Sequence, residues 1–165
     1  MNNLENLILK ALEQLNKLNS EQISNLVEIK EANSKSLLSI LINEHIVDEE
    51  TFFDVLSNIY RRGNADIDDI STDLQVDQKR FIEHVCKKFK ITFFDLDDID
   101  IDYRISEKLS TAQLKTYSAI PVKEDEISVY VAFKNPFDVI AQDKVQNLFN
   151  RKLLKVACAD PAQIE

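Results

Sequence analysis

The sequence predicts an α+β protein in which an N-terminal helical subdomain is followed by a small α/β sandwich with a three- to four-stranded sheet. Apolar residues recur at the spacing of amphipathic helices through the first third of the chain. Residues 127–133 instead alternate in the manner of a half-buried strand. With 165 residues, 44% of them hydrophobic, the chain is long enough to bury a core of its own.

The helical subdomain is expected to cover residues 1–63. Its first helix carries a single apolar stripe, and Leu9 lies off that stripe. Asn19 and Gln22 have the spacing of a reciprocal N-terminal cap, so a second helix is expected to begin there. The stripe of the first helix consists of Leu4, Leu7, Ile8, Ala11, Leu12, Leu15 and Leu18.

Two further helices complete this subdomain. Residues 36–44 are apolar on most sides, so that helix should lie at the centre of the bundle. Asp48 is a favourable N-cap for the next helix, because its carboxylate can accept a hydrogen bond from a free backbone N–H of the first turn. Gly63 can adopt the left-handed conformation in which helices often end.

The junction between the subdomains is expected within residues 64–73. Aspartates alternate with isoleucines there, a polar pattern typical of a linker or a short capped turn. The second subdomain is accordingly expected to cover residues 66–165. It opens with an amphipathic helix over residues 74–90 and continues with strands and helices over residues 91–165.

A helix predicted over residues 136–150 connects two apolar strands of the second subdomain. If those strands are parallel, the three elements form a right-handed crossover. One face of this helix carries Ala141, Val145, Leu148 and Phe149. Strands are expected at residues 91–94, 119–122, 127–133 and 153–157, and two short helices around residues 105–109 and 112–117.

The chain contains a single glycine, Gly63. Loops that hold phosphates or dinucleotides need several glycines, because backbone N–H groups must approach the phosphate closely. No segment of this chain can therefore form such a loop, and an ATPase core is excluded. No serine or cysteine lies in a recognisable nucleophile context, so enzymatic activity is not expected.

A formal net charge of −9 disfavours binding to nucleic acid or anionic lipid, which is driven largely by lysine and arginine. The acidic surface fits either a basic protein partner or a solvated face that keeps the protein soluble. No apolar run approaches the roughly 20 residues that span a bilayer. We therefore expect a cytoplasmic location without direct membrane insertion.

Cys86 and Cys158 lie in apolar surroundings and form no CxxC pair, so both are expected to be buried as small hydrophobic residues. His45 and His84 lie on different predicted helices and lack the paired spacing of metal ligands on one helix. The aspartate runs lack the ligand spacing and the glycine of a calcium loop. No metal or cofactor is expected in this chain.

Four motifs follow one another in the second half of the chain. They are Phe94-Asp95-Leu96, Ala119-Ile120-Pro121-Val122, the strand at residues 127–133, and the helix start Asn135-Pro136-Phe137-Asp138. This order resembles the second half of the N-terminal domain of type II secretion and type IV pilus assembly ATPases. The resemblance implies a docking domain that binds the cytoplasmic domain of an inner-membrane platform protein in a secretion, pilus or DNA-uptake system.

The same resemblance implies a longer protein, hexameric at full length, in which ATP and magnesium bind only an ATPase core that this chain lacks. Asp160, Pro161 and Gln163 have the pattern of a helix start at the end of the chain. The family places its link to the ATPase just beyond this point, so we expect a monomeric or dimeric fragment that reaches the inner membrane through its partner. Attachment of the module to another protein, such as a membrane glycosyltransferase, is an alternative.

A cyclic di-GMP sensor is the alternative function, because some members of this family bind that dinucleotide through a helical motif. The motif uses an arginine, two glycines and a final glutamine. Aligned through its apolar residues, these positions are occupied here by Ser36, Leu38, His45 and Ile59. Arginine pairs with or stacks on guanine and glycine lets the backbone approach the ligand, so the substitutions predict that the nucleotide site is lost.

Leu9, Phe53 and Tyr60 are the predicted partner-binding residues. Leu9 lies off the buried stripe of its helix, and the two aromatic residues lie at the margin of a stripe that other residues already fill. Large apolar side chains in such positions are costly to expose unless a partner covers them. The alternative for the two aromatic residues is a core role, packed against the α/β subdomain.

Overall fold

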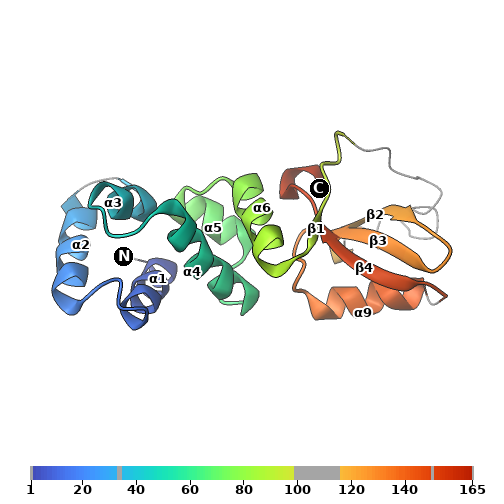
Figure 1. Ribbon diagram of the computed structural model, residues 1–165, viewed down its shortest axis with the longest axis horizontal. Coiled ribbons are helices and arrows are strands. Elements are labelled where there is room, and N and C mark those ends of the chain that lie inside the picture. Colours follow the sequence, from blue (N-terminus) through green and yellow to red (C-terminus); the bar gives the residue numbers. More distant parts are fainter. Residues whose placement is uncertain (1, 33–34, 99–115, 150, 165) are drawn as a thin grey trace. The chain divides into compact units, whose positions relative to one another are not determined.

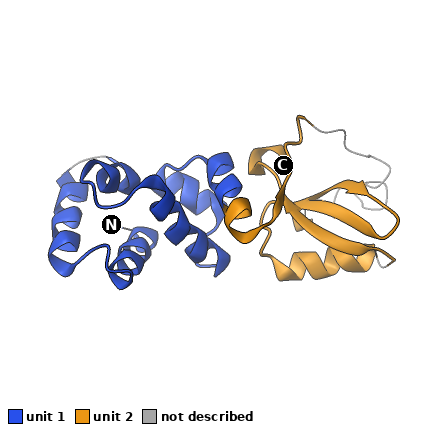
Figure 2. Ribbon diagram, viewed as in Figure 1, with its two compact units in different colours: residues 1–84 blue, residues 85–165 orange. Residues whose placement is uncertain are grey.

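The computed structural model describes residues 2–32, 35–98, 116–149 and 151–164. It confirms the predicted class, because a helical N-terminal part is followed by a mixed four-stranded sheet with accompanying helices (Figure 1). The chain divides into two compact units, Met1–His84 and Val85–Glu165 (Figure 2). We call them the helical unit and the sheet unit.

The helical unit consists of short helices whose predicted caps are present. Asn19 and Gln22 each donate a backbone N–H to the other's side chain, at 2.9 and 2.8 Å. Asp48 accepts a 2.8 Å hydrogen bond from the backbone N–H of Thr51, and this bond lowers the pKa of Asp48. The helices are α1 Asn3–Gln14, α2 Ser20–Ala32, α3 Leu37–Asn43, α4 Glu49–Arg61, α5 Ile67–Leu74 and α6 Gln78–Phe89, which continues into the sheet unit.

Several helices end in a left-handed residue, as predicted for Gly63 after α4 (φ 78°). In this nearly glycine-free chain the other ends use residues with side chains. An L-residue with a side chain costs roughly 1–2 kcal/mol in this conformation, so these helix ends hold backbone strain. The positions are Asn16 after α1, His45 after α3, Gln75 after α5 and Lys90 after α6.

The buried faces of α1 and α3 differ from the predicted stripes. Leu9 is buried although it lies off the stripe, because α1 packs against both α4 and α5 and so buries a wider arc. Leu15, expected on the stripe, is 57% exposed, since the helix has ended and Leu15 is its C-cap. Ile42 is exposed as well, so α3 is less central in the bundle than its mostly apolar sequence predicts.

The segment expected to join the subdomains is a helix instead. Asp66 caps α5 by accepting a 2.8 Å hydrogen bond from the backbone N–H of Asp69. The alternation of aspartate and isoleucine is therefore the pattern of a cap followed by one buried face, formed by Ile67, Ile70 and Leu74. The boundary between the units falls after His84 and not within residues 64–73.

The sheet unit has the strand order β1-β4-β3-β2. β2 is antiparallel to β3, with an irregularity in register between Pro121 and Lys123, whereas β3 and β1 are both parallel to β4. The predicted strand–helix–strand connection between parallel strands is thus present. The elements are β1 Thr92–Phe93, β2 Ala119–Glu124, β3 Ser128–Phe133, α9 Val139–Leu148, β4 Leu153–Cys158 and α10 Pro161–Ile164. The short helices expected around 105–109 and 112–117 lie wholly or largely outside the described residues.

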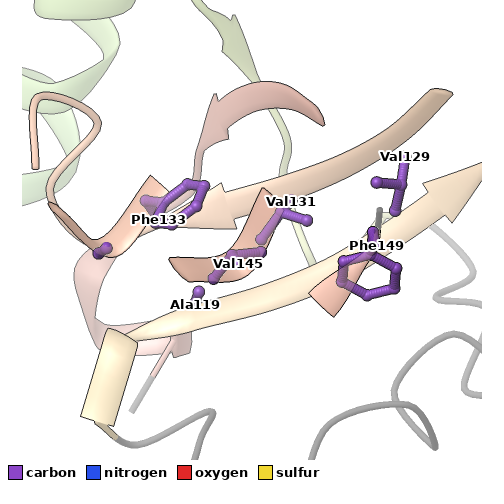
Figure 3. Packing of buried hydrophobic residues seen from close by; sticks show 7 residues of the cluster. Ala119, Val129, Val131, Phe133, Val145 and Phe149 are labelled. Atoms are coloured by element: carbon purple, nitrogen blue, oxygen red, sulfur yellow. The ribbon is translucent and has the colours of Figure 1, made fainter. Parts of the chain in front are cut away.

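Alternation along β3 supplies both faces of the sheet with core residues. Val129, Val131 and Phe133 point to the face that α9 covers (Figure 3). They pack with Ala119 of β2 and with three residues of the predicted helix face, Ala141, Val145 and Phe149. On the other face, buried Val122, Ala132 and Ala159 contact the half-buried Phe94, Leu96 and Ile164.

The two helix starts in the sheet unit use different chemistry from that expected. α9 begins after Asp138 and not at Pro136, because Asn135 accepts a 2.9 Å hydrogen bond from the N–H of Phe137 and holds those residues in a turn. α10 begins at Pro161 as predicted. The Gln163 side chain, however, turns away from its cap and accepts a 3.2 Å hydrogen bond from the Leu96 N–H.

Candidate docking surface

The three predicted partner-binding residues are buried. Leu9, Phe53 and Tyr60 are 3%, 6% and 2% exposed. The ring of Phe81 lies edge-on to the rings of Phe53 and Tyr60, at centroid distances of 6.1 and 5.5 Å, and so joins the two aromatic residues in one cluster. These contacts give the aromatics a core role inside the helical unit. Partner binding by the three residues stays a prediction, and direct contact would require the covering helices to separate.

Neither histidine belongs to a group of three potential metal ligands among the described residues. His84 Nε2 lies 2.8 Å from Asp54 Oδ1, and its ring packs edge-on against Phe53. His45 is exposed at the end of α3. Over the described ranges, no three His, Cys, Asp or Glu side chains gather as a metal site would require. None of the described helices is long and apolar enough to cross a membrane.

A hollow of about 140 Å³ lies between α2 and the turn that follows α3. Its floor is apolar and consists of buried Leu26 with half-buried Ile29 and Ile46. Its rim is formed by Gln22, Asn25 and Glu44. The sequence indicated that α2 is a helix, but the hollow needs two elements side by side, and no local pattern predicts that pairing.

The turn after α3 brings Ile46 to this hollow. His45 takes the left-handed conformation, with φ 54°, and the N–H of Ile46 donates a 3.0 Å hydrogen bond to the carbonyl of Leu41. This bond closes the helix end and reverses the chain, which places an apolar side chain just after the helix. His45 stands where the cyclic di-GMP motif has a glycine, and it adopts the left-handed conformation that glycine favours.

The surroundings of the hollow are acidic. Glu21 and Glu28 are exposed and lie four before and three after Asn25, so they continue the rim along α2. Glu44 lies on the opposite rim. The one cation of α2, Lys30, is directed to Glu5 of α1, with 3.9 Å between Nζ and Oε2. Carboxylates therefore flank an apolar floor on two sides.

The positions that correspond to the cyclic di-GMP motif present few groups for a nucleotide. The hydroxyl of Ser36 accepts a 3.2 Å hydrogen bond from the backbone N–H of Ser39 and caps α3. Leu38 is half-buried and Ile59 is buried, and both are apolar. None of these side chains can replace the charge and the planar donors of an arginine.

The two cysteines are both buried, as expected, but they also lie together in the sheet unit. A hydrogen bond with the Cys86 thiol, and burial after it, raise the pKa of Cys158. β1 explains the proximity: Phe93 pairs with Cys158, while the N–H of Ile91 donates a 2.9 Å hydrogen bond to the Cys86 carbonyl. The sequence could not indicate this pair, because it depends on a strand pairing across the unit.

Comparisons with known proteins agree with the motif order of the second half. Residues 89–165 match the family model of the MshEN domain. A structure of the N-terminal domain of XpsE is 14% identical, with a TM-score of 0.50 over 78% of this chain and 88% of that chain. Another structure of the same XpsE domain is 16% identical, with a TM-score of 0.42 over 99% and 92%.

A structure of MshE with cdg is 13% identical to this chain, with a TM-score of 0.48 over 99% of this chain and 94% of that chain. A comparison with curated proteins gave no match. The XpsE structure with a TM-score of 0.50 shows a shared fold, and the match over residues 89–165 confirms the resemblance to secretion and pilus ATPase N-terminal domains.

Proposed function

We propose that this chain, whose residues 89–165 match the MshEN domain family, docks an assembly ATPase onto its membrane platform. The system would be type II secretion, a type IV pilus or DNA uptake. The bound partner would be the cytoplasmic domain of an inner-membrane platform protein. The chain would thereby be held at the inner membrane, while ATP is hydrolysed by another domain.

The family match carries this proposal. The matched segment contains the four strands and α9, and N-terminal domains of secretion ATPases are non-catalytic. The fold shared with the XpsE domain extends over 78% of this chain, a larger share than the sheet unit alone. A domain without a phosphate-binding loop can serve an ATPase by positioning it, and docking is the simplest such role.

The competing function is cyclic di-GMP sensing. Ser36 already caps a helix, and Leu38 and Ile59 offer no polar atoms, so these positions give it no support. A ligand at a hundred times its Kd stabilises a fold by about 2.7 kcal/mol. Addition of cyclic di-GMP at high micromolar concentration should leave the melting temperature unchanged, and a clear increase would reinstate the sensor.

Calorimetric titration of the platform protein's cytoplasmic domain into the chain tests docking. We expect saturable binding in the micromolar range, with no binding of Mg-ATP by the same chain. The absence of any complex with the platform domain at high micromolar concentration would refute the proposed function. Micromolar binding of Mg-ATP would refute the proposal that ATP is bound and hydrolysed by another domain.

A further inference from the structure

We propose that the hollow between α2 and the turn after α3 binds the apolar face of a helix flanked by lysine or arginine, supplied by a protein partner. This inference rests on the proposed docking function and assigns it to one surface. The surface, here called the α2 groove, has a floor of Leu26, Ile29 and Ile46 and carboxylates of Glu21, Glu28 and Glu44 around it.

The size of the α2 groove favours a single anchoring side chain. This hollow has about 140 Å³, is open to solvent and is lined by three apolar and three polar residues. An enclosed apolar cavity of about 150 Å³ holds benzene, so the room in the hollow is of the order of one side chain. Sites for drug-sized ligands usually have roughly 300–1,000 Å³, so a cyclic dinucleotide would not fit within it. An amphipathic helix can insert one apolar residue and lay its neighbours along the groove.

The weak attachment of α2 indicates that its outer face is a contact surface. α2 and α4 both have 13 residues, yet only Leu26 is buried in α2, whereas α4 buries seven residues. Helices in proteins gain most of their stability from packing an apolar face against other elements. Half-buried Ile29, together with Ile46 from the neighbouring turn, leaves apolar surface that a partner helix would cover.

The charge around the groove determines which kind of helix fits. Glu21 and Glu28 lie on one side and Glu44 on the other, while Lys30 is already directed to Glu5. Complementary charges at an interface rim raise the association rate and exclude partners of the same charge. A helix with lysine or arginine beside its apolar stripe therefore fits the α2 groove, and an acidic helix does not.

Methyl NMR of the full chain with two model peptides tests this assignment. One is a helical peptide with leucine at i, i+3, i+4 and i+7 and lysine elsewhere, and the other has glutamate in place of lysine. The lysine peptide should produce saturable shifts of the Ile29 and Ile46 methyl signals, and the glutamate peptide should not. No shift at either residue, or equal shifts with both peptides, would overturn the proposal.

Charge reversal supplies the matched control. The double variant Glu28→Lys/Glu44→Lys should bind the lysine peptide about tenfold more weakly, because two attractive rim pairs become repulsive. Glu126→Lys/Asp143→Lys changes two exposed carboxylates of the sheet unit by the same net charge and should bind as the wild type does. If both double variants bind the lysine peptide equally weakly, net charge alone explains the loss of affinity. That result would overturn the assignment of binding to the α2 groove.

Binding of the platform domain distinguishes failure of the proposed docking function from failure of the proposed docking site. If it binds the wild type and Glu28→Lys/Glu44→Lys equally well, docking stands but the α2 groove is not the docking site. If it does not bind at all while the lysine peptide still shifts Ile29 and Ile46, the proposed function fails and the groove takes a basic helix from another protein.

Discussion

The helical unit and the sheet unit contribute different things to this chain. The sheet unit contains the motif order and the family match, which lie within residues 89–165. The helical unit lies entirely before that match and carries the candidate docking surface. The segment that matches a domain family and the segment that we propose to contact a partner therefore need not coincide.

The physical reason lies in where the backbone N–H and C=O groups of each unit find their hydrogen-bond partners. β3 and β4 are held by neighbouring strands, so their register and their side-chain directions are fixed together. A helix satisfies its own backbone hydrogen bonds, and its position depends on side-chain packing alone. A helix such as α2 can therefore be left half covered at little backbone cost, whereas a central strand cannot.

The largest expected effects come from truncating one phenylalanine in each unit. Phe53→Ala and Phe133→Ala both remove a buried ring and should lower the free energy of unfolding by about 3–5 kcal/mol. Urea denaturation gives the magnitude, and hydrogen exchange shows which helices or strands open. An unchanged denaturation midpoint for Phe53→Ala, with weaker binding of the platform domain, would return Phe53 to the interface that its sequence position predicted.

The thiol pair should make the sheet unit sensitive to alkaline pH. The raised pKa of Cys158 keeps its proton in the folded state at pH values where an unfolded thiol, with a pKa of about 8.5, has lost it. Stability is therefore complete below that pH and falls above it, by up to about 1.4 kcal/mol per pH unit. Urea midpoints between neutral and alkaline pH should decline less in Cys158→Ala, and an identical decline in that variant would contradict the account.

Loss of a helix cap should have a similar effect in the two units. Asp66→Ala and Asp138→Ala each remove the acceptor for one free N–H at the start of a helix and should cost about 1 kcal/mol in thermal or urea unfolding. The effect of Asp66→Ala is the more informative of the two, because the sequence predicted a junction between subdomains where α5 lies. A neutral effect of Asp66→Ala alone would mean that α5 contributes nothing to the helical unit.

The smallest expected effect is an increase in stability. His45→Gly in the helical unit and Lys90→Gly in the sheet unit replace left-handed residues with the one residue that adopts this conformation without strain. Each should raise stability by about 0.5–1 kcal/mol, measured as an increase in melting temperature. Asn16→Gly is the control, because asparagine tolerates the conformation better and should gain less. A loss of stability in all three variants would contradict the conclusion that the left-handed residues are strained.

The sequence predicts local features well and relations between distant segments poorly. The caps at Asn19 and Asp48 and the alternation along β3 are local patterns, and the structure contains them. The burial of Leu9 depends on two helices that approach α1, which no pattern in α1 reveals. The α2 groove depends in the same way on how α2 lies beside the turn after α3.

Mapping of the platform domain on the chain by amide NMR tests the central claim most directly. We expect saturable perturbations of α2 and of the turn around Ile46, with the strands of the sheet unit unaffected. Such a result would place docking in the helical unit, which precedes the whole segment that matches the family. Perturbations confined to the sheet unit, or no perturbation at all with excess platform domain, would contradict the account.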